Sequence, residues 1–442
     1  MHQSRQNALP SFLTKPLAWV PSSYFAEGVP FALVIWVAGT LFKDLGYRDG
    51  EITIATASVG LAWSCKPLWA PLLDMWKSKK FFVLFTQFGM AALVGLGAFM
   101  MQVPGLEYFQ VLVPILWVLA FCSATHDICV DGVYITTLDS EQQAAHIGVQ
   151  GMAWQGGRIF ATAALVWIAG FLQEDQGMAT NVAWSYSLML GAATLFALGI
   201  YHRFVLPEGT PATRPESVKA AAQGFVTAAV DFLRKPQIWG MLIFVFLFRS
   251  GEGFLLVEAP LFLQSPVEEG GLGLSLKDKG MIDGTISTML SMLGGLVGGL
   301  FIARYGLRRT LFFMALCTNV PNLCYVVMSQ LVTESGAPSF LFVAVLVSIE
   351  KFGYSFGFTA NMLYMMQQMA PGRFPMTHYA FCTALMNLVL VPTQMVSGLL
   401  AEWMGYRGFF MFVIVASVPS IIAAWFAPFP LKDETGPAAK SA

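Results

Sequence analysis

Two acidic residues four positions apart, Asp127 and Asp131, stand inside a long apolar stretch of this chain. A helix over that stretch would hold both carboxyl groups on one face. Two carboxylates this close in a medium of low dielectric disfavour joint ionisation, so at least one can hold and exchange a proton near neutral pH. The pattern predicts proton exchange at this face, and a static ion pair with Arg158 or Lys66 is the alternative. The adjacent His126 is expected to pack among helices instead.

Further ionisable side chains lie inside other apolar stretches, where an unpaired charge costs roughly 2.5–3.5 kcal/mol. These side chains are Glu27, Lys66, Arg158, Arg249, Glu252, Glu350 and Lys351. Arg249 and Glu252 are three residues apart and could simply neutralise each other. The adjacent Glu350 and Lys351 are expected to point in different directions, so that one of them reaches a cavity. Glu258 lies nearer the end of its stretch and is expected at the rim.

The composition indicates the class of protein that must position these charges. Of 442 residues, 56% are hydrophobic, 14% aromatic and only 12% charged. An average soluble domain carries about 25% charged residues, so this chain cannot cover a water-exposed surface. Disordered chains are rich in charge and poor in aromatic residues, which excludes that class. The net charge of −1 gives no sign of a nucleic-acid partner. A polytopic protein of the lipid bilayer remains.

No pattern of catalytic or metal-binding residues occurs in the sequence. The six cysteines fall inside apolar segments without a CxxC pair, and there is no P-loop, HExxH motif or nucleophile elbow. We therefore expect no catalytic site, no metal, no cofactor and no enzymatic activity. Energy for work across the membrane would come from an ion or solute gradient.

Twelve stretches are long and apolar enough to cross a bilayer as helices, which takes about 20 residues. Their approximate bounds are 17–42, 51–75, 81–101, 108–136, 146–171, 182–205, 237–263, 281–303, 310–331, 339–369, 376–402 and 407–428. The predicted fold class is an all-α membrane protein with twelve transmembrane helices in two pseudo-symmetric six-helix bundles.

The chain reads as two halves joined by a proline-containing polar stretch. The predicted domains are an N-terminal six-helix bundle at 1–205, a cytoplasmic linker at 206–236, and a C-terminal six-helix bundle with a short tail at 237–442. The acid–glycine pair at 27–28 recurs at 252–253, in the equivalent stretch of the second half. Parallel six-helix repeats around a central cavity are the architecture of major facilitator transporters.

Lysine and arginine are distributed unevenly between the two sides. If the N-terminus is cytoplasmic, 16 of the 25 lie in segments on the cytoplasmic side, five lie on the other side, and four lie within stretches. Cytoplasmic loops carry the excess of positive charge. Both termini are therefore expected in the cytoplasm.

Two matching turns carry charges that could control a conformational change. The turn after the second stretch has Asp74 followed by the basic segment 77–80, and the turn after the eighth has Arg304 and Arg308, with Ala303 in place of the acid. An acid beside a basic turn can lock one conformation through ion pairs that later break. Gating is therefore predicted for Asp74, Arg304 and Arg308, and anchoring by positive charge alone is the alternative.

Three segments carry a family resemblance. Residues 24–30 read YFAEGVP, residues 66–74 read KPLWAPLLD, and residues 124–132 read ATHDICVDG. Together they resemble the AmpG-like permeases of the major facilitator superfamily, and the related acetyl-CoA transporters share the style of the third segment. The chain differs in having His126 where glutamine is common, and in having fewer hydrophobic segments than those permeases tend to have.

The resemblance implies import across the bacterial inner membrane, driven by protons. AmpG-type permeases carry anhydro-muropeptides released during cell-wall recycling, and relatives carry siderophores or acetyl-CoA. We expect a monomeric secondary active transporter that imports a small polar solute, such as a muropeptide, amino-sugar or oligosaccharide, by alternating access. A siderophore or acyl-CoA permease and an exporter of drugs or metabolites are the alternatives. A membrane enzyme or a non-transporting sensor fits less well, because the charges cluster at mid-depth and not at one interface.

The expected roles of the buried charges follow from this mechanism. Asp127 or Asp131 would carry the coupling proton, together with Glu27. The residues expected to bind the solute are Arg158, Lys66, Arg249, Glu252, Glu350 and Lys351.

Overall fold

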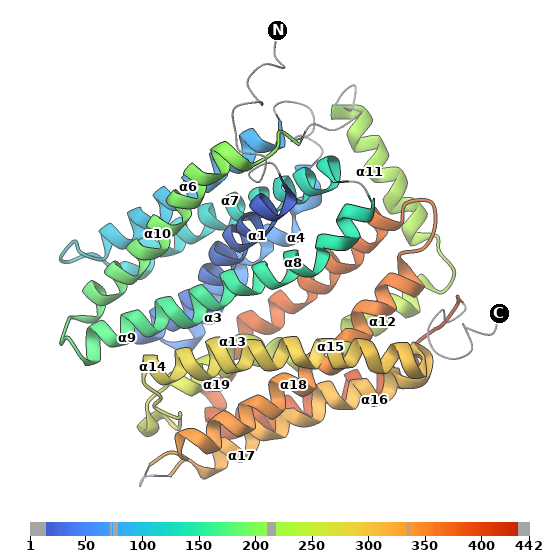
Figure 1. Ribbon diagram of the computed structural model, residues 1–442. Coiled ribbons are helices and arrows are strands. Elements are labelled where there is room, and N and C mark those ends of the chain that lie inside the picture. Colours follow the sequence, from blue (N-terminus) through green and yellow to red (C-terminus); the bar gives the residue numbers. More distant parts are fainter. Residues whose placement is uncertain are drawn as a thin grey trace. The chain divides into compact units, whose positions relative to one another are not determined.

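The structure of the protein is a computed structural model, and it describes residues 15–70, 73, 78–138, 140–209, 218–333 and 336–431 (Figure 1). Across these residues the regular secondary structure is helical, and an isolated antiparallel bridge joins Thr333 to Gly336. The predicted all-α fold class is therefore confirmed.

The described residues form two compact units. The N-terminal unit consists of the described residues within Met1–Val37 and Cys65–Ala222, and the C-terminal unit of those within Ala38–Ser64 and Gln223–Ala442. Residues 38–64 thus pack with elements that follow residue 223, a grouping that no repeat in the sequence indicates. Within the C-terminal unit they do so through contacts of α3 (Asp49–Val59) with α19 (Pro375–Trp425), and of α2 (Ala38–Asp44) with α13 (Glu252–Gln264).

The N-terminal unit has long α-helices and short 3-10 or π-helical segments, the latter marked η. Its elements are α1 (Pro16–Ala32), η2 (Leu33–Val37), η3 (Lys66–Leu68), α6 (Lys79–Met100), α7 (Tyr108–Thr137), α8 (Ser140–Ile159), η4 (Phe160–Leu165), α9 (Val166–Glu174) and α10 (Thr180–Val205). α1 packs on α8, α7 and α10, while α6 packs on α7 and α10 (Figure 1). α1 is therefore the element that meets charged residues from several neighbours.

The C-terminal unit continues with a second set of helices. Besides α2, α3, α13 and α19 it contains α4 (Leu61–Ser64), α12 (Ile238–Phe248), η5 (Val267–Glu269), α14 (Leu276–Lys279), η6 (Gly280–Ile286), α15 (Ser287–Tyr305), α16 (Leu307–Asn319), η7 (Val320–Asn322), α17 (Leu323–Leu331), α18 (Phe340–Tyr364) and η8 (Met365–Met369). α18 packs on α15 and α16, and α19 packs on α12, α13 and α16.

Helix lengths follow from the lengths of the apolar runs. α6 has 22 residues, which at about 1.5 Å per residue is close to the roughly 30 Å of a bilayer core. It begins after Ser78, whose side chain accepts a 3.4 Å hydrogen bond from the backbone N–H of Phe81. The stretches predicted at 81–101, 108–136 and 182–205 agree within two residues with α6, α7 and α10.

Ten helical stretches of the described chain are long and apolar enough to cross a membrane. One of them, Thr377–Trp425, covers both predicted stretches 376–402 and 407–428, because α19 turns at Gly405 with a φ of 66°. The stretch predicted at 51–75 is not among the ten. It is interrupted into α3, α4 and η3, and Pro67 inside η3 cannot donate a backbone hydrogen bond. The ten helical stretches therefore cover eleven of the twelve predicted stretches, because Thr377–Trp425 covers two of them. The interrupted stretch at 51–75 is the twelfth.

The predicted linker at 206–236 differs from a plain polar connection, because it contains the helix α11 (Val218–Leu233). Ala228 and Phe232 are each 2% exposed and lie in the core of the C-terminal unit, with Phe225 packed against them. Spacings of three and four residues put these side chains on one helix face. The linker is therefore partly an amphipathic helix.

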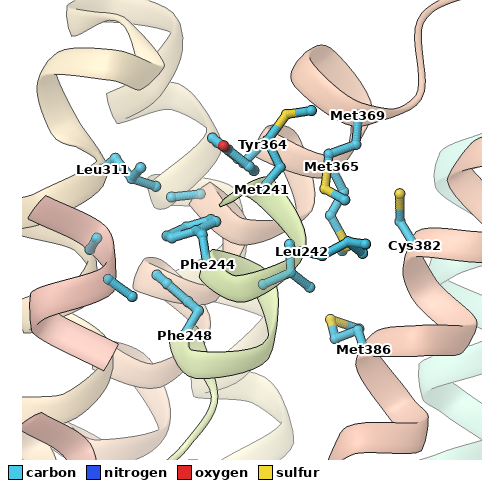
Figure 2. Close-up of a cluster of buried hydrophobic side chains, with 14 of the residues drawn as sticks. Met241, Leu242, Phe244, Phe248, Leu311, Tyr364, Met365, Met369, Cys382 and Met386 are labelled. Atoms are coloured by element: carbon cyan, nitrogen blue, oxygen red, sulfur yellow. The ribbon is translucent and has the colours of Figure 1, made fainter. Parts of the chain in front are cut away.

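The main hydrophobic core of the C-terminal unit surrounds α12 (Figure 2). The ring centroid of Phe244 on α12 lies 4.4 Å from the ring centroid of Tyr364 on α18 and 5.4 Å from that of Phe248. Met365 and Met386 are both buried in the same core. This packing fixes the first half of the seventh predicted stretch, immediately before the charged residues described below.

Candidate functional site

Lys66 lies among the charged residues of the N-terminal unit. Its ammonium group forms an ion pair with Asp127 on α7. It also interacts electrostatically with Glu27 on α1 and with Asp131 on α7. The side chains of Lys66 and Asp127 are 26% and 13% exposed, and Glu27 is buried. The structure thus brings four of the sequence-predicted residues together, with one cation facing three carboxylates.

The two acids of α7 have different partners. Tyr24 on α1 donates a 2.7 Å hydrogen bond from its hydroxyl group to Oδ1 of Asp131, whereas Asp127 pairs with Lys66. Of the alternatives drawn from sequence, the ion pair between Asp127 and Lys66 is therefore present. Asp131 accepts a hydrogen bond from a neutral donor and also interacts electrostatically with Lys66, so a change in its protonation would alter both interactions.

Arg158 occupies another part of the same unit, near the end of α8. Its guanidinium carbon lies 4.3 Å from the centroid of the Trp36 ring in η2, a cation–π contact. Trp154, one turn earlier on α8, packs against Phe31 at a centroid distance of 5.4 Å. The Trp154 side chain also reaches Glu27 as a hydrogen-bond donor. α8 therefore presents an indole N–H to Glu27 on α1 and an arginine to η2.

Two glycines allow α1 and α8 to approach this closely. A Cβ atom on Gly28 would lie 2.3 Å from the backbone oxygen of Trp154, and one on Gly157 would lie 2.3 Å from the backbone oxygen of Phe25. Real Cβ atoms do not tolerate such distances, so small residues are required where the two backbones meet. Glu27 and Arg158, the neighbours of these glycines, are positioned by the same contact.

His126 is fully buried in α7, and its ring nitrogens have no hydrogen-bond partner among the described residues. This agrees with the expectation that it packs among helices.

The seventh predicted stretch is broken where its charges lie. α12 ends at Phe248 and α13 begins at Glu252. Arg249 donates from Nε to Oε2 of Glu252 at 2.7 Å and from Nη2 to Oε1, and Tyr354 on α18 donates to Oε1 at 2.7 Å. Arg249 also stacks over Phe358, 4.8 Å from the ring centroid. The mutual neutralisation that the spacing allowed is therefore confirmed, with a tyrosine as an additional partner.

Glu350 and Lys351 correct a prediction. Their adjacency suggested that they point apart, but Nζ of Lys351 lies 3.0 Å from Oε2 of Glu350. The directions of the two Cα–Cβ bonds predict that the side chains diverge. The long side chain of Lys351 can nevertheless fold back along the helix surface and reach Glu350. Tyr325 on α17 donates a 3.3 Å hydrogen bond to the same Oε2. These two residues thus form an ion pair supported by a tyrosine.

The predicted gating residues have the following positions. Asp74 lies outside the described residues. Arg304 is exposed at the end of α15 and stacks 5.4 Å from the ring centroid of Tyr305. Arg308 is exposed in the first turn of α16 and lies 5.7 Å from the ring centroid of Phe429. Gly306 makes the turn between the two helices with a φ of 91°.

Glu258 is not a rim residue. It lies on α13 and is 0% exposed, so its predicted position was wrong. Elements distant in sequence cover it, as described below, and a count of residues along one helix cannot reveal them.

Sequence reasoning missed the neutral donors of the site. Tyr24, Trp154, Tyr325 and Tyr354 each face one of the buried acids. A signal existed for Tyr24, which stands three residues before Glu27 on the same helix face. Nothing in the local sequence of Tyr325 points to Glu350.

The arrangement favours binding and proton exchange over covalent chemistry. Within each unit, buried or partly buried carboxylates are paired with a cation or a neutral donor. Such groups persist in a membrane where they serve a pathway or a ligand. Among the described residues, no group of three or more His, Cys, Asp and Glu side chains could hold a metal ion.

Comparison with known proteins gives consistent results. A profile of the Major Facilitator Superfamily matches residues 22–390. The anhydromuropeptide permease of Escherichia coli strain K12 is 27% identical over 405 residues, which cover 90% of this chain and 77% of that protein. The putative transporter AmpG 4 of Rickettsia conorii is 21% identical over 405 residues, covering 89% of this chain and 92% of that protein. The predicted resemblance to AmpG-like permeases is confirmed.

Solved structures share the fold at low identity. The nucleoside transporter NupG superimposes with a TM-score of 0.67 at 15% identity, covering 93% of this chain and 98% of that one. A bacterial homologue of the human lysosomal transporter Spinster, in an inward-facing and occupied conformation, gives a TM-score of 0.67 at 14% identity, with 94% and 96% covered.

Proposed function

Since this chain belongs to the Major Facilitator Superfamily and is a multi-pass membrane transporter of that type, we propose that it imports a polar solute by proton-coupled alternating access. An anhydromuropeptide is the first candidate solute, because the E. coli relative carries that name and is similar over 90% of this chain.

The observation that carries the proposal is the position of Lys66 among Glu27, Asp127 and Asp131. One cation cannot neutralise three carboxylates at once, so the group has affinity for a proton or for a second cation. Binding of a proton to one acid would weaken its hold on Lys66. The ammonium group could then turn to an anionic or polar group of the solute, which couples the two binding events.

The remaining charged residues have proposed roles around the solute. Arg158 and the Arg249–Glu252 pair would contact polar solute groups, and so would Glu350 and Lys351. Asp74, Arg304 and Arg308 would form and break contacts as the conformation changes.

We place the transporter in the bacterial inner membrane as a monomer with both termini in the cytoplasm. This orientation rests on the distribution of lysine and arginine. We further propose that two six-helix bundles, 1–205 and 237–442, are the units that alternate, with the 206–236 segment on the cytoplasmic side.

The test is uptake of radiolabelled anhydromuropeptide into proteoliposomes that contain the purified protein. An inward gradient of about one pH unit should allow about tenfold accumulation for each coupled proton, and a protonophore should abolish the accumulation. Uptake equal to that of empty liposomes would refute the solute. Uptake that is the same with and without the pH gradient, and with and without the protonophore, would refute the proton coupling.

A thermal-shift screen separates the alternative solutes. Cell-wall fragments should raise the melting temperature by preferential binding to the folded state. Stabilisation only by siderophores or acyl-CoA would identify one of the other permease types. An uncoupler that raises accumulation in cells would indicate an exporter.

A further inference from the structure

Glu258 is a fully buried acid whose carboxylate oxygens have no hydrogen-bond partner among the described residues. Burial of an ionised carboxylate without a partner is strongly unfavourable, whereas a protonated carboxyl group can be buried more easily and can donate one hydrogen bond. The position of Glu258 on α13 therefore requires a charge, a proton or a ligand nearby.

The acid next to Glu258 is Asp49, at the start of α3, and the two side chains are within hydrogen-bonding reach. Asp49 itself has partners suited to an ionised carboxylate. Nζ of Lys43 lies 2.9 Å from its Oδ1, and the hydroxyl group of Tyr406 donates to its Oδ2 at 2.5 Å. Asp49 can therefore stay charged beside Glu258 and accept a hydrogen bond from it if Glu258 holds a proton.

The other charged and titratable groups around Glu258 come from every element packed against it. Those that interact with Glu258 are Lys43 on α2, Asp49 on α3, and Glu402 and Tyr406 on α19. Lys279 on α14 interacts with Asp49 and Lys43. We call these residues, with Glu258, the Asp49 cluster. All of them belong to the C-terminal unit.

The neighbouring cations are held by other groups. Lys43 contacts Asp49 and lies 3.3 Å from Glu269. Lys279 donates to Oγ1 of Thr40 at 2.8 Å and to Oε1 of Gln264 at 3.0 Å. Neither lysine forms an ion pair with Glu258 among the described contacts, so a proton is the cation that remains to neutralise it.

Arg48 is similarly held, by a 2.7 Å ion pair with Glu402. A pocket of about 270 Å³ is lined by Arg48, Lys43, Asp49, Glu269 and Glu402, among others. Asp49 therefore lies on the wall of an open pocket and also beside the buried Glu258. A proton could pass from water in the pocket to Asp49 and then to Glu258.

The cluster joins α3 to α13 and α19. The backbone N–H of Gly50 donates to Oε1 of Glu402 at 2.8 Å. Thr53 donates to the backbone oxygen of Met395 at 3.3 Å and accepts from the N–H of Gly398 at 3.3 Å. A change in charge at Asp49 or Glu258 would therefore affect the contacts that hold α3 against α13 and α19.

We propose that Glu258 and Asp49 form a proton-binding site that attaches α3 to α13 and α19 when it holds one proton. When the O–H bond of Glu258 breaks, the proton leaves through Asp49 to water in the pocket, and two carboxylates remain side by side. Their repulsion loosens α3. The proposal goes beyond the transport function, because it assigns a proton site to a unit separate from the Lys66 group.

Infrared spectroscopy tests the proton directly. The purified full-length protein, without solute, should show the absorption of a protonated carboxyl group at neutral pH. The part of that absorption due to Glu258 should be lost in Glu258→Gln, so that the band is weaker than in the parent protein. It should be retained in full in Glu269→Gln, a control that replaces an exposed acid beside Lys43. A spectrum of Glu258→Gln identical to that of the parent protein would overturn the proposal.

Cysteine labelling tests the attachment of α3. Ala57→Cys, on the buried face of α3, is introduced into a variant whose six native cysteines are replaced, and its reaction with a maleimide is followed from about pH 5 to 9. The reference is Ile54→Cys, at an exposed position of the same helix. The ratio of the two rates removes the pH dependence that the two thiols share. The ratio should rise about tenfold when Glu258 ionises and should stay low at all pH values in Glu258→Gln.

If Glu258→Gln does not fold, Glu258→Asp keeps a titratable carboxyl group at the site and should keep the pH-dependent rise. A pH-independent ratio in both the parent and Glu258→Asp would contradict the proposal. Neither measurement uses a transported solute, so failure of muropeptide uptake would leave these results interpretable.

Discussion

Tyr24 donates a 2.7 Å hydrogen bond to Oδ1 of Asp131, and this contact connects α1 with α7 in the N-terminal unit. Asp127, one turn earlier on α7, is engaged by Lys66. Two acids on one helix face thus have a neutral and a charged partner, respectively. Because Asp127 forms the ion pair with Lys66 whereas Asp131 is hydrogen-bonded by a neutral group, we propose Asp131 and not Asp127 as the carrier of the exchanging proton.

Asp131→Asn is expected to abolish proton-driven uptake while leaving exchange of labelled for unlabelled solute across the membrane. An amide of the same shape can still accept from Tyr24 but cannot carry a proton. The two assays are run on the same proteoliposomes. Full gradient-driven accumulation by Asp131→Asn would exclude this residue as the proton carrier.

Tyr24→Phe is expected to slow proton-driven uptake by about tenfold, since a hydrogen bond to a charged group contributes roughly 1.5–3 kcal/mol. Tyr201→Phe is the matched control, because the hydroxyl group of Tyr201 donates to the backbone oxygen of Ala18 at 2.8 Å and not to an acid. The prediction is wrong if both variants change the initial rate to the same extent.

Lys66 and Asp127 are expected to be coupled in stability. Loss of one partner of a buried pair leaves a charge uncompensated and costs roughly 3–5 kcal/mol, toward the lower end here because both side chains are partly exposed. Thermal unfolding of Lys66→Met, Asp127→Asn and the double variant measures this coupling. The double variant should be more stable than Lys66→Met and still inactive in uptake. Strictly additive losses would show that the two residues act independently.

The sequence was most informative where one physical requirement dominates. A helix in lipid must satisfy its own backbone hydrogen bonds over about 20 apolar residues, and α6, α7 and α10 accordingly begin and end within two residues of their predicted bounds. The pairing of Arg249 with Glu252 was equally accessible, because both residues are on one local segment.

Contacts between distant segments were not accessible in this way. The position of Glu258 along its own helix predicts a rim residue, whereas Asp49 and Tyr406 cover it from remote parts of the chain. The sequence alone allows either Arg158 or Lys66 as the ion-pair partner of an acid on α7. Only the packing of η3 against α7 places Lys66 beside Asp127.

Gly157→Ala is expected to disrupt the contact between α1 and α8, since the added Cβ would lie 2.3 Å from the backbone oxygen of Phe25. Gly151→Ala, on the same helix, is the control, because no atom outside the local helix backbone lies within 4 Å of its added Cβ. In an exposed helix position this change should stabilise by up to about 1 kcal/mol. Melting temperatures that rise in both variants would show that α8 does not need the close approach.

Arg249→Lys is expected to destabilise the C-terminal unit by about 1–3 kcal/mol, although it keeps the charge. The guanidinium group donates to both carboxylate oxygens of Glu252 and stacks over Phe358, and a lysine ammonium group cannot reproduce that geometry. Tyr354→Phe removes the neighbouring donor to Glu252. The losses of stability caused by Arg249→Lys and Tyr354→Phe should therefore not add up in the variant that carries both changes.

Arg304→Lys is the control for Arg249→Lys, because Arg304 is exposed on α15 and contacts the ring of its neighbour Tyr305. The unfolding midpoint of each variant, measured by tryptophan fluorescence, should fall clearly for Arg249→Lys and change little for Arg304→Lys. Equal shifts would mean that the break between α12 and α13 is held by the packing of Phe244 and Phe248 and not by the Arg249–Glu252 pair.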